Sequence, residues 1–193
     1  NQRRASIVRA ARREFARAGY QGASTASIAR AAGCSEPILY KHFTGKQEIF
    51  AAVLEEGADS VLRIFDELVE AEGELQVLLD DFLDAVMQNA GYIEIMRMRA
   101  LAVTLVDDPT MRDTLDRMQR RQLQRTERIV RRGIAEGMMR ADTDPAYVSW
   151  SWQGLMMVGC YREALEPGGF AAMRPHVSRF LRDLRPPAPA EET

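Results

Sequence analysis

The stretch from Ser24 to Lys46 reads STASIARAAGCSEPILYKHFTGK. Small apolar residues at helical spacing predict a helix over residues 25–32, which a hydroxyl side chain at its start can cap. Gly33 is free to adopt a positive φ and therefore predicts a turn. A second short helix is predicted over residues 36–42, with Pro37 in its first turn, where the missing N–H costs little. Two short helices joined by a glycine turn form a helix-turn-helix motif.

Charge sets the surrounding region apart from the rest of the chain. Residues 1–46 carry nine Lys and Arg side chains against two Asp and Glu, whereas the other 147 residues carry 17 against 26. Within this basic head, residues 3–18 place apolar side chains at helical spacing, so a further helix is predicted that ends at Gly19. A basic head on an acidic body indicates binding to a polyanion, although charge alone leaves a chance excess open. Motif and charge together predict a DNA-binding head.

Distinct residue types stand at fixed spacing along the same region: Ala10-Ala11, Phe15, Gly19-Tyr20, Thr25, Ile28-Ala29, Ala32-Gly33, Ser35, Leu39-Tyr40, His42-Phe43 and Lys46. On these residues, the stretch from Ile7 to Phe50, about a quarter of the chain, resembles the DNA-binding domain of the tetracycline-repressor (TetR) family of bacterial transcriptional regulators. The resemblance implies an all-α fold of about nine helices, with an N-terminal helix-turn-helix DNA-binding domain and a C-terminal helical ligand-binding and dimerisation domain. It also implies a homodimer on a palindromic double-stranded DNA operator. It does not identify the ligand, because the second domain diverges within the family.

The helix over residues 36–42 is expected to enter the major groove of DNA. Hydroxyl and cationic groups are expected to hold phosphates, and these belong to Thr25, Tyr40, His42 and Lys46. Base edges are expected to be read by Glu36, Pro37, Ile38 and Lys41. Glu36 departs from the residues common at its position in the family. Its carboxylate must accept from cytosine N4, be neutralised by Lys41 or turn away.

From residue 46 onward, apolar residues at i, i+3, i+4 spacing predict one helix after another. The predicted spans are 46–70, 74–90, 92–107, 110–137, 145–165 and 174–185. Glu48 stands three residues after Gly45, in the position of a capping box for the first of them. Three regions are predicted: a helix-turn-helix DNA-binding domain over 1–48, a helical ligand-binding and dimerisation domain over 49–185, and a disordered tail over 186–193.

All ten methionines lie in this helical body, and methionine adapts to irregular apolar shapes. A pocket for a small, largely apolar effector is therefore predicted, although methionines also fill gaps in ordinary cores. Its predicted lining is Phe65, Phe82, Met96, Arg99, Met118, Trp152 and Met156, with Arg97 or Arg99 as the anchor for a carboxylate or phosphate. The eight arginines between Arg112 and Arg132 are interpreted as the solvated face of a long helix.

The segment 147–165 is apolar nearly all round, which indicates burial on more than one side. The resemblance implies that the last two helices of each subunit form a four-helix dimer interface. The expected contact residues are Trp150, Leu155, Val158, Val177, Phe180, Leu181 and Leu184. A purely intramolecular pair of core helices is the alternative.

Together with these patterns, the resemblance implies a ligand-responsive regulator, a repressor that binds its operator as a homodimer and is released by the effector. The alternative is a regulator of the same fold without a small-molecule effector, controlled by a partner protein or constitutive. An enzyme, a cofactor and a metal site are not expected, because two His and two distant Cys supply no catalytic or metal-ligand constellation. Cys34 is interpreted as a small core side chain rather than a redox group. No apolar run approaches the roughly 18 residues that cross a bilayer, and no secretory signal opens the chain, which predicts a cytoplasmic protein without a membrane partner.

Overall fold

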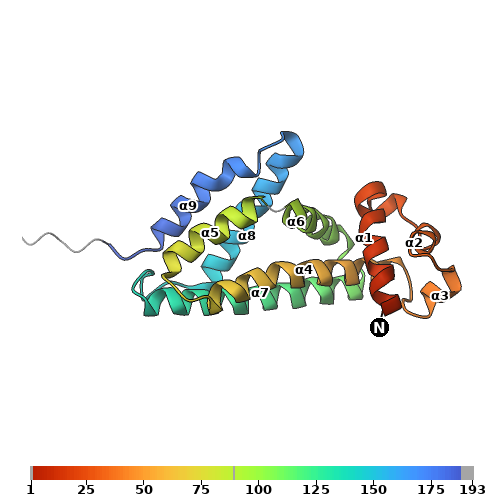
Figure 1. The fold of residues 1–193 in the computed structure, drawn as a ribbon, viewed down its shortest axis with the longest axis horizontal. Coiled ribbons are helices and arrows are strands. Elements are labelled where there is room, and N and C mark those ends of the chain that lie inside the picture. The colour runs from red at the N-terminus through yellow and green to blue at the C-terminus, as the bar shows by residue number, and fades with distance from the viewer. Residues whose placement is uncertain (1, 89, 188–193) are drawn as a thin grey trace, which may run out of the picture. The chain divides into compact units, whose positions relative to one another are not determined.

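The computed structural model describes residues 2–88 and 90–187 of the 193. In this part of the chain every regular element is a helix and there is no strand, so the predicted all-α fold is confirmed (Figure 1). The elements are α1 (Gln2–Gly22), α2 (Thr25–Ala31), α3 (Glu36–Tyr40), α4 (Lys46–Glu70), α5 (Leu75–Gln88), α6 (Ala90–Ala102), α7 (Pro109–Ala135), α8 (Pro145–Leu165) and α9 (Arg174–Asp183), with short 3-10 helices η1 (Val103–Leu105) and η2 (Ala171–Met173). Each predicted helix is present, and the observed ends lie within a few residues of the predicted ones.

Gly19 interrupts α1 where the sequence predicted its end. The residue leaves the helical conformation with φ 68° and ψ 172°, and α1 then continues for three residues to Gly22. Glycine adopts a positive φ without the steric penalty that a Cβ atom brings. The interruption is therefore as predicted, but the helix ends three residues later.

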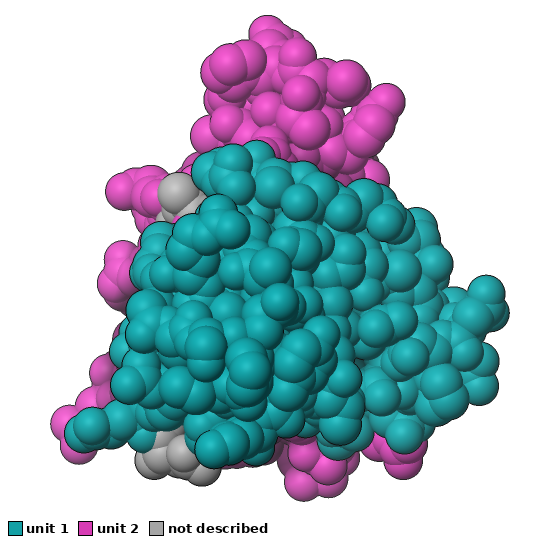
Figure 2. All heavy atoms as spheres, turned by 90° about the vertical axis from the view of Figure 1, so that its right-hand side faces the viewer, with its two compact units in different colours: residues 1–59, 98–118 teal, residues 60–97, 119–193 magenta. Residues whose placement is uncertain are grey.

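The chain divides into two compact units, coloured separately in Figure 2. Unit 1 comprises residues 1–59 and 98–118, and unit 2 comprises residues 60–97 and 119–193. Unit 1 holds the whole predicted DNA-binding head together with the first turns of α4. A functional domain boundary after residue 48 stays a prediction.

Three aromatic rings from α1 and α4 build the core of unit 1. The Phe50 ring centroid lies 5.0 Å from that of Phe15 and 5.0 Å from that of Tyr20. Packing of this kind stabilises beyond the burial of apolar area. Ile28 of α2 and Leu39 of α3 are fully buried, so each of these two short helices is anchored by an apolar side chain in the core.

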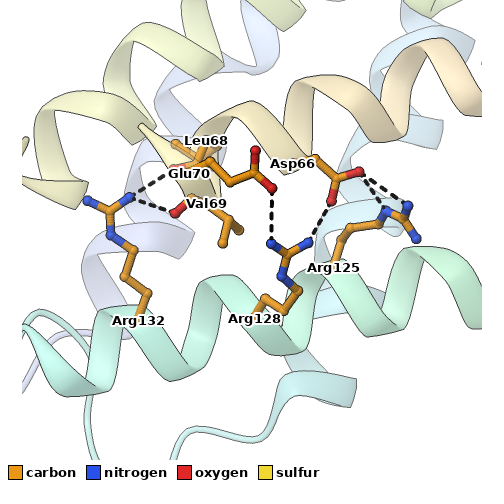
Figure 3. Close-up of polar contacts among 7 residues, drawn as sticks. All are labelled: Asp66, Leu68, Val69, Glu70, Arg125, Arg128 and Arg132. Atoms are coloured by element: carbon orange, nitrogen blue, oxygen red, sulfur yellow. Dashed lines mark hydrogen bonds and ion pairs between the residues drawn. The ribbon is translucent and has the colours of Figure 1, made fainter. Parts of the chain in front are cut away.

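Arginines tie α7 to the C-terminal part of α4 in unit 2 (Figure 3). Arg125 and Arg128 reach the two carboxylate oxygens of Asp66 over 3.2 and 2.8 Å, and Arg128 also reaches Glu70 over 3.5 Å. All of these side chains come from facing turns of α4 and α7, as Figure 3 shows. They are ion pairs between helices rather than freely solvated charges.

Arg132 closes the end of α4 through main-chain carbonyls. Its Nη1 donates to the carbonyl oxygens of Leu68, Val69 and Ala71 over 3.0, 3.2 and 3.0 Å, and its Nη2 donates to that of Gly73 over 2.7 Å. The last carbonyls of a helix have no helical partner and carry the negative end of its dipole, which a guanidinium group neutralises. The interpretation of this arginine-rich face as solvated is therefore wrong for Arg125 and Arg132, whereas Arg128 is both exposed and paired.

The predicted disordered tail is described only at Pro186 and Pro187, which belong to no regular element. Its remainder, residues 188–193, lies outside the described residues. Among the helices that the structure describes, none combines the length and the apolar character that crossing a membrane requires.

Candidate nucleic-acid interface

Three residues predicted to meet DNA are brought together across the turn between α2 and α3. Thr25 Oγ1 donates a hydrogen bond to Glu36 Oε1 over 2.7 Å and lies 3.2 Å from the hydroxyl oxygen of Tyr40. Because the single proton of Thr25 goes to Glu36, the Tyr40 hydroxyl is the donor in the second bond. Of the outcomes expected for Glu36, the structure therefore has its carboxylate turned onto Thr25.

The exposed side of α3 carries the other predicted base-reading residues. Pro37, Ile38 and Lys41 are exposed, the last directly after the helix, and 52% of Tyr40 is exposed. The fully buried Leu39 fixes which side of α3 faces outward. An apolar side chain beside a lysine on an open face is suited to thymine methyl groups and guanine acceptors.

His42 lies outside the helix in which the sequence placed it. α3 ends at Tyr40, so the half-buried His42 belongs to the turn that follows. The next residue, Phe43, is buried, and the Arg4 guanidinium lies 4.8 Å from the centroid of its ring. This turn is thereby held against α1.

The ammonium group of Lys46 makes most of its contacts with other residues of the head. Its Nζ donates to the carbonyl oxygens of Tyr20 and Ala23 over 2.8 and 3.0 Å and lies 4.4 Å from the centroid of the Tyr20 ring. An ammonium group has three N–H donors, so one is left for another acceptor. The sequence did not reveal this anchoring role, because it depends on carbonyls more than 20 residues away.

Side chains cap the helices on either side of the motif. Ser24 Oγ accepts from the Ser27 N–H over 3.1 Å, and Ser27 Oγ accepts from the Ser24 N–H over 3.1 Å, so α2 begins with a reciprocal box. At the start of α4, Glu48 Oε2 accepts from the N–H and the hydroxyl of Thr44 over 2.6 and 2.8 Å. The predicted cap is present there, but its partner is Thr44 instead of Gly45.

Three predicted effector residues in unit 2 form an aromatic cluster. The Phe82 ring centroid lies 5.0 Å from that of Phe65 and 5.4 Å from that of Trp152. Met96 and Met156, in the same unit, are buried. The other two candidates, the half-buried Arg99 and the buried Met118, belong to unit 1.

The cluster contains a polar group without a partner. Trp152 is 6% exposed, and its Nε1–H has no hydrogen-bond acceptor among the described residues. A buried donor that is left unpaired costs free energy, so such a group marks a place where another molecule can contribute an acceptor.

The predicted dimer residues fall into two groups. Trp150 and Val158 of α8 are 69% and 50% exposed, whereas Val177 and Leu184 are buried within the chain itself. Leu155, Phe180 and Leu181 are half-buried. Three further exposed apolar side chains on α8, Tyr147, Tyr161 and Leu165, lie outside the predicted interface set. Tyr147 stands three residues before Trp150, and Tyr161 stands three residues after Val158.

Both cysteines are free thiols. Burial raises the pKa of the Cys160 thiol to about 11, so this thiol stays protonated near neutral pH. Cys34, in the turn of the motif, is partly buried. Within the described part of the chain, no group of three or more His, Cys, Asp and Glu could hold a metal ion.

Comparison with known proteins places this geometry in context. Residues 7–53 match the profile of bacterial regulatory proteins, tetR family. Over 62 residues, 32% of this chain, the sequence is 39% identical to the HTH-type transcriptional activator FasR of Mycolicibacterium smegmatis, and the match spans only 28% of FasR.

Two solved structures share the fold over nearly the whole chain. A transcriptional regulator of the TetR family from Agrobacterium tumefaciens gives a TM-score of 0.75 at 16% identity, covering 92% of this chain and 97% of that one. The complex of SmeT with triclosan gives a TM-score of 0.71 at 18% identity, covering 95% and 89%. At such identities the likeness shows the fold.

The fold and the α2–α3 motif define an all-helical protein with a helix-turn-helix head. Its residues 7–53 match the tetR family of bacterial regulatory proteins, the family that this stretch of sequence resembles.

Proposed function

We propose that the protein is a transcriptional repressor that binds a palindromic DNA operator as a homodimer and leaves it when a small, largely apolar effector binds its body. The observation that carries this proposal is the exposed side of α3, where Pro37, Ile38 and Lys41 face solvent while Leu39 anchors the helix from behind. A short helix presented in this way fits the major groove. Because the target is chromosomal DNA, the proposed place of action is the cytoplasm.

Phosphate contacts are assigned to the hydroxyl and cationic groups around α3. The half-exposed Tyr40 hydroxyl, the ring of His42 and the third N–H of Lys46 are the proposed donors to the DNA backbone. Lys46 has a second role in this proposal, because it holds the loop between α1 and α2 on the first turn of α4.

The homodimer is supported by an exposed apolar stripe on α8. Tyr147, Trp150, Val158, Tyr161 and Leu165 are each at least half exposed, from 50% to 69%. A patch of this kind on one helix marks an interaction site. We assign a second copy of the chain as its occupant, since a palindromic operator needs two heads related by a two-fold axis.

Phe180 extends the stripe onto α9, because its ring centroid lies 6.3 Å from that of Tyr147. The buried Val177 and Leu184 are proposed to hold α9 in place instead of contacting the second copy.

An effector site is proposed at the aromatic cluster of unit 2. Phe65 and Phe82 supply an apolar surface, and the unpartnered Trp152 N–H supplies one hydrogen-bond donor. This combination suits a largely apolar molecule with a single acceptor. The SmeT complex, in which a protein of this fold binds triclosan, supports a small lipophilic compound as the class of effector.

The proposed response is a shift between two arrangements of the two heads. Binding to both half-sites requires recognition helices about one DNA turn, ~34–36 Å, apart. An effector that prefers a different separation lowers operator affinity in proportion to its preference.

DNA binding is tested with a duplex selected from a random library by the purified protein. Tyr40→Phe and Lys41→Ala each remove one proposed contact, and both are expected to weaken binding several-fold. Lys41→Ala is also expected to reduce the slope of affinity against salt by about one if Lys41 meets a phosphate. Arg63→Ala is the matched control, because it removes an exposed charge from α4 outside the head. Affinities of both head variants equal to that of the control would contradict the assignment.

Effector binding is tested in a Trp150→Phe protein, which keeps Trp152 as the one tryptophan of the two in the chain. Triclosan and related lipophilic compounds are titrated while the fluorescence of Trp152 and the affinity for the selected duplex are followed. A fluorescence change together with loss of DNA affinity is expected. A change in fluorescence at unaltered DNA affinity would contradict the ligand response.

A further inference from the structure

Glu36 occupies the polar groups that are proposed to receive DNA. It is the first residue of α3, and its Oε1 accepts the proton of Thr25, which in turn accepts from Tyr40. Both hydroxyl groups are proposed phosphate contacts. In the free head, a carboxylate oxygen therefore occupies the hydroxyl group of Thr25, which the proposed complex assigns to a phosphate oxygen.

The hydrogen bond of the Glu36 carboxylate goes to a neutral group. Within the described residues Glu36 forms no ion pair, and its partner is the neutral hydroxyl of Thr25. It is also one of only two acidic side chains in residues 1–46, beside nine basic ones. The other, Glu14, is paired with Arg17 over 3.0 Å on α1. Of these two carboxylates, Glu14 has an ion-pair partner among the described residues and Glu36 has a hydroxyl group.

A phosphate that binds Thr25 must displace the Glu36 carboxylate from this hydroxyl group. The phosphate is also repelled by the negative charge of the carboxylate. Both effects weaken binding to every DNA sequence. A carboxylate is a pure acceptor, so it recovers free energy only where the major groove presents a donor. Cytosine N4 is such a donor. Adenine N6 is a less favourable one, because the neighbouring N7 is an acceptor that faces the carboxylate.

We infer that Glu36 is the residue that sets specificity against non-cognate DNA, by opposing backbone binding everywhere and by accepting from the N4 amino group of a cytosine in each half-site. This inference rests on the proposed function, and it identifies one base that the operator must contain. The carboxylate lowers the affinity for random DNA, and on the operator it accepts a hydrogen bond from cytosine.

The experiment compares the wild-type protein with Glu36→Gln, Glu36→Ala and the control Glu14→Gln. Glu36→Gln and the control each remove one negative charge from the same head. Each protein is titrated with a duplex of mixed sequence and with the duplex selected by the wild type. The duplex selected by the wild type is also made with single base-pair replacements. Melting curves establish that all four proteins are folded.

Glu36→Gln and Glu36→Ala are expected to bind mixed-sequence DNA roughly five- to tenfold more tightly than the wild type, because one charge close to a phosphate has an effect of this size. Glu14→Gln is expected to differ from the wild type by less than about twofold, because its charge is already paired. On the selected duplex, replacing one C·G pair per half-site is expected to weaken wild-type binding roughly tenfold and to leave Glu36→Ala unaffected.

The outcomes separate this inference from the proposed function. If the wild type selects no duplex, the proposed function is wrong, and the inference is wrong with it. If the wild type selects a duplex but Glu36→Gln matches Glu14→Gln on mixed-sequence DNA, the inference alone is overturned. It is also overturned if Glu36→Ala keeps the same preference for cytosine.

Discussion

Arg132, in the last turn of α7, donates its Nε–H over 2.7 Å to Oε1 of Glu136, the residue that directly follows this helix. Each of these two side chains also forms hydrogen bonds with main-chain groups at the end of another helix. Arg132 binds carbonyls of the last turn of α4 and of the residues that follow it. Glu136 Oε2 accepts from the N–H of Leu75, the first residue of α5, over 3.0 Å. The connection between α4 and α5 is therefore fixed to α7 from both sides, within unit 2.

Replacing Arg132 by Met keeps the apolar stem of the side chain and removes the donors to four carbonyls. We expect the free energy of unfolding to fall by about 2 kcal/mol, since hydrogen bonds to charged groups contribute on this order. Arg131→Met is the matched control, because the exposed Arg131 pairs only with Glu127 on its own helix, and it should change stability by less than about 0.5 kcal/mol. Urea unfolding followed by circular dichroism measures both. Equal effects of the two replacements would show that the carbonyl contacts do not stabilise the end of α4.

The stability contributed by Glu136 depends on pH. Its hydrogen bond with Arg132, followed by that from the Leu75 N–H, lowers the pKa of this carboxyl group below its ordinary value. A lowered pKa in the folded state means that the stabilisation is present above the unfolded-state pKa and is lost as the pH falls through the folded-state pKa. Glu136→Gln should therefore be less stable than the wild type at pH 7, with a difference that shrinks in acid. Melting curves from pH 7 to pH 3 test this, and a difference that grows in acid would contradict it.

Gly159 is required where the loop after α8 folds back onto the helix. A Cβ atom at this position would lie 2.7 Å from Phe170 Cδ2 and 3.3 Å from Met173 Cγ, and Phe170 is 1% exposed. In a free helix, Gly→Ala stabilises by about 1 kcal/mol. Here the overlap outweighs that gain, and we expect Gly159→Ala to lower stability by roughly 1–2 kcal/mol. A higher melting temperature for this variant would show that Phe170 can move aside at little cost.

The dimer proposal is tested at two exposed positions on α8. Trp150→Glu and Val158→Glu, made together, leave the core of the protomer intact because both side chains lie mostly in solvent. We expect the variant to be a folded monomer by size-exclusion chromatography with light scattering, with operator affinity reduced at least about tenfold. Val77→Glu is the control, since Val77 is 55% exposed on α5, outside the stripe. If the double variant kept the mass of the dimer and the operator affinity of the wild type, the assignment of α8 to the dimer interface would be wrong.

The sequence predicted the elements of this fold well because their signals are local. Helical spacing, a hydroxyl cap from Ser24 or Thr25 and the Gly33 turn each depend on neighbours within a few residues. In the structure Ser24 is the cap and Gly33 has φ 65°. The roles of Glu36 and Lys46 were not predictable in the same way. Thr25 meets Glu36 across 11 residues, and Lys46 meets carbonyls 23 and 26 residues away, so both contacts arise only after folding.

The same distinction explains the errors in the body of the protein. Periodicity shows that α7 carries arginines on one face, but it does not show that α4 supplies acids and open carbonyls opposite them. The family resemblance likewise groups Val177 and Leu184 with exposed side chains of α8 in one interface, whereas burial separates them. The spacing of apolar residues in the sequence identifies which face of a helix is apolar, but only the folded structure shows which element covers that face.

Joint reading of one palindrome by two copies of this helix-turn-helix head is measured by titrating the protein with two duplexes. One is the palindrome that the wild-type protein selects from a random library, and the other keeps a single half-site in otherwise mixed sequence. We predict saturation at two protomers per palindrome, with affinity at least about a hundredfold above that for the single half-site at the same salt concentration. Equal affinity for the palindrome, the half-site and mixed-sequence DNA would contradict the account.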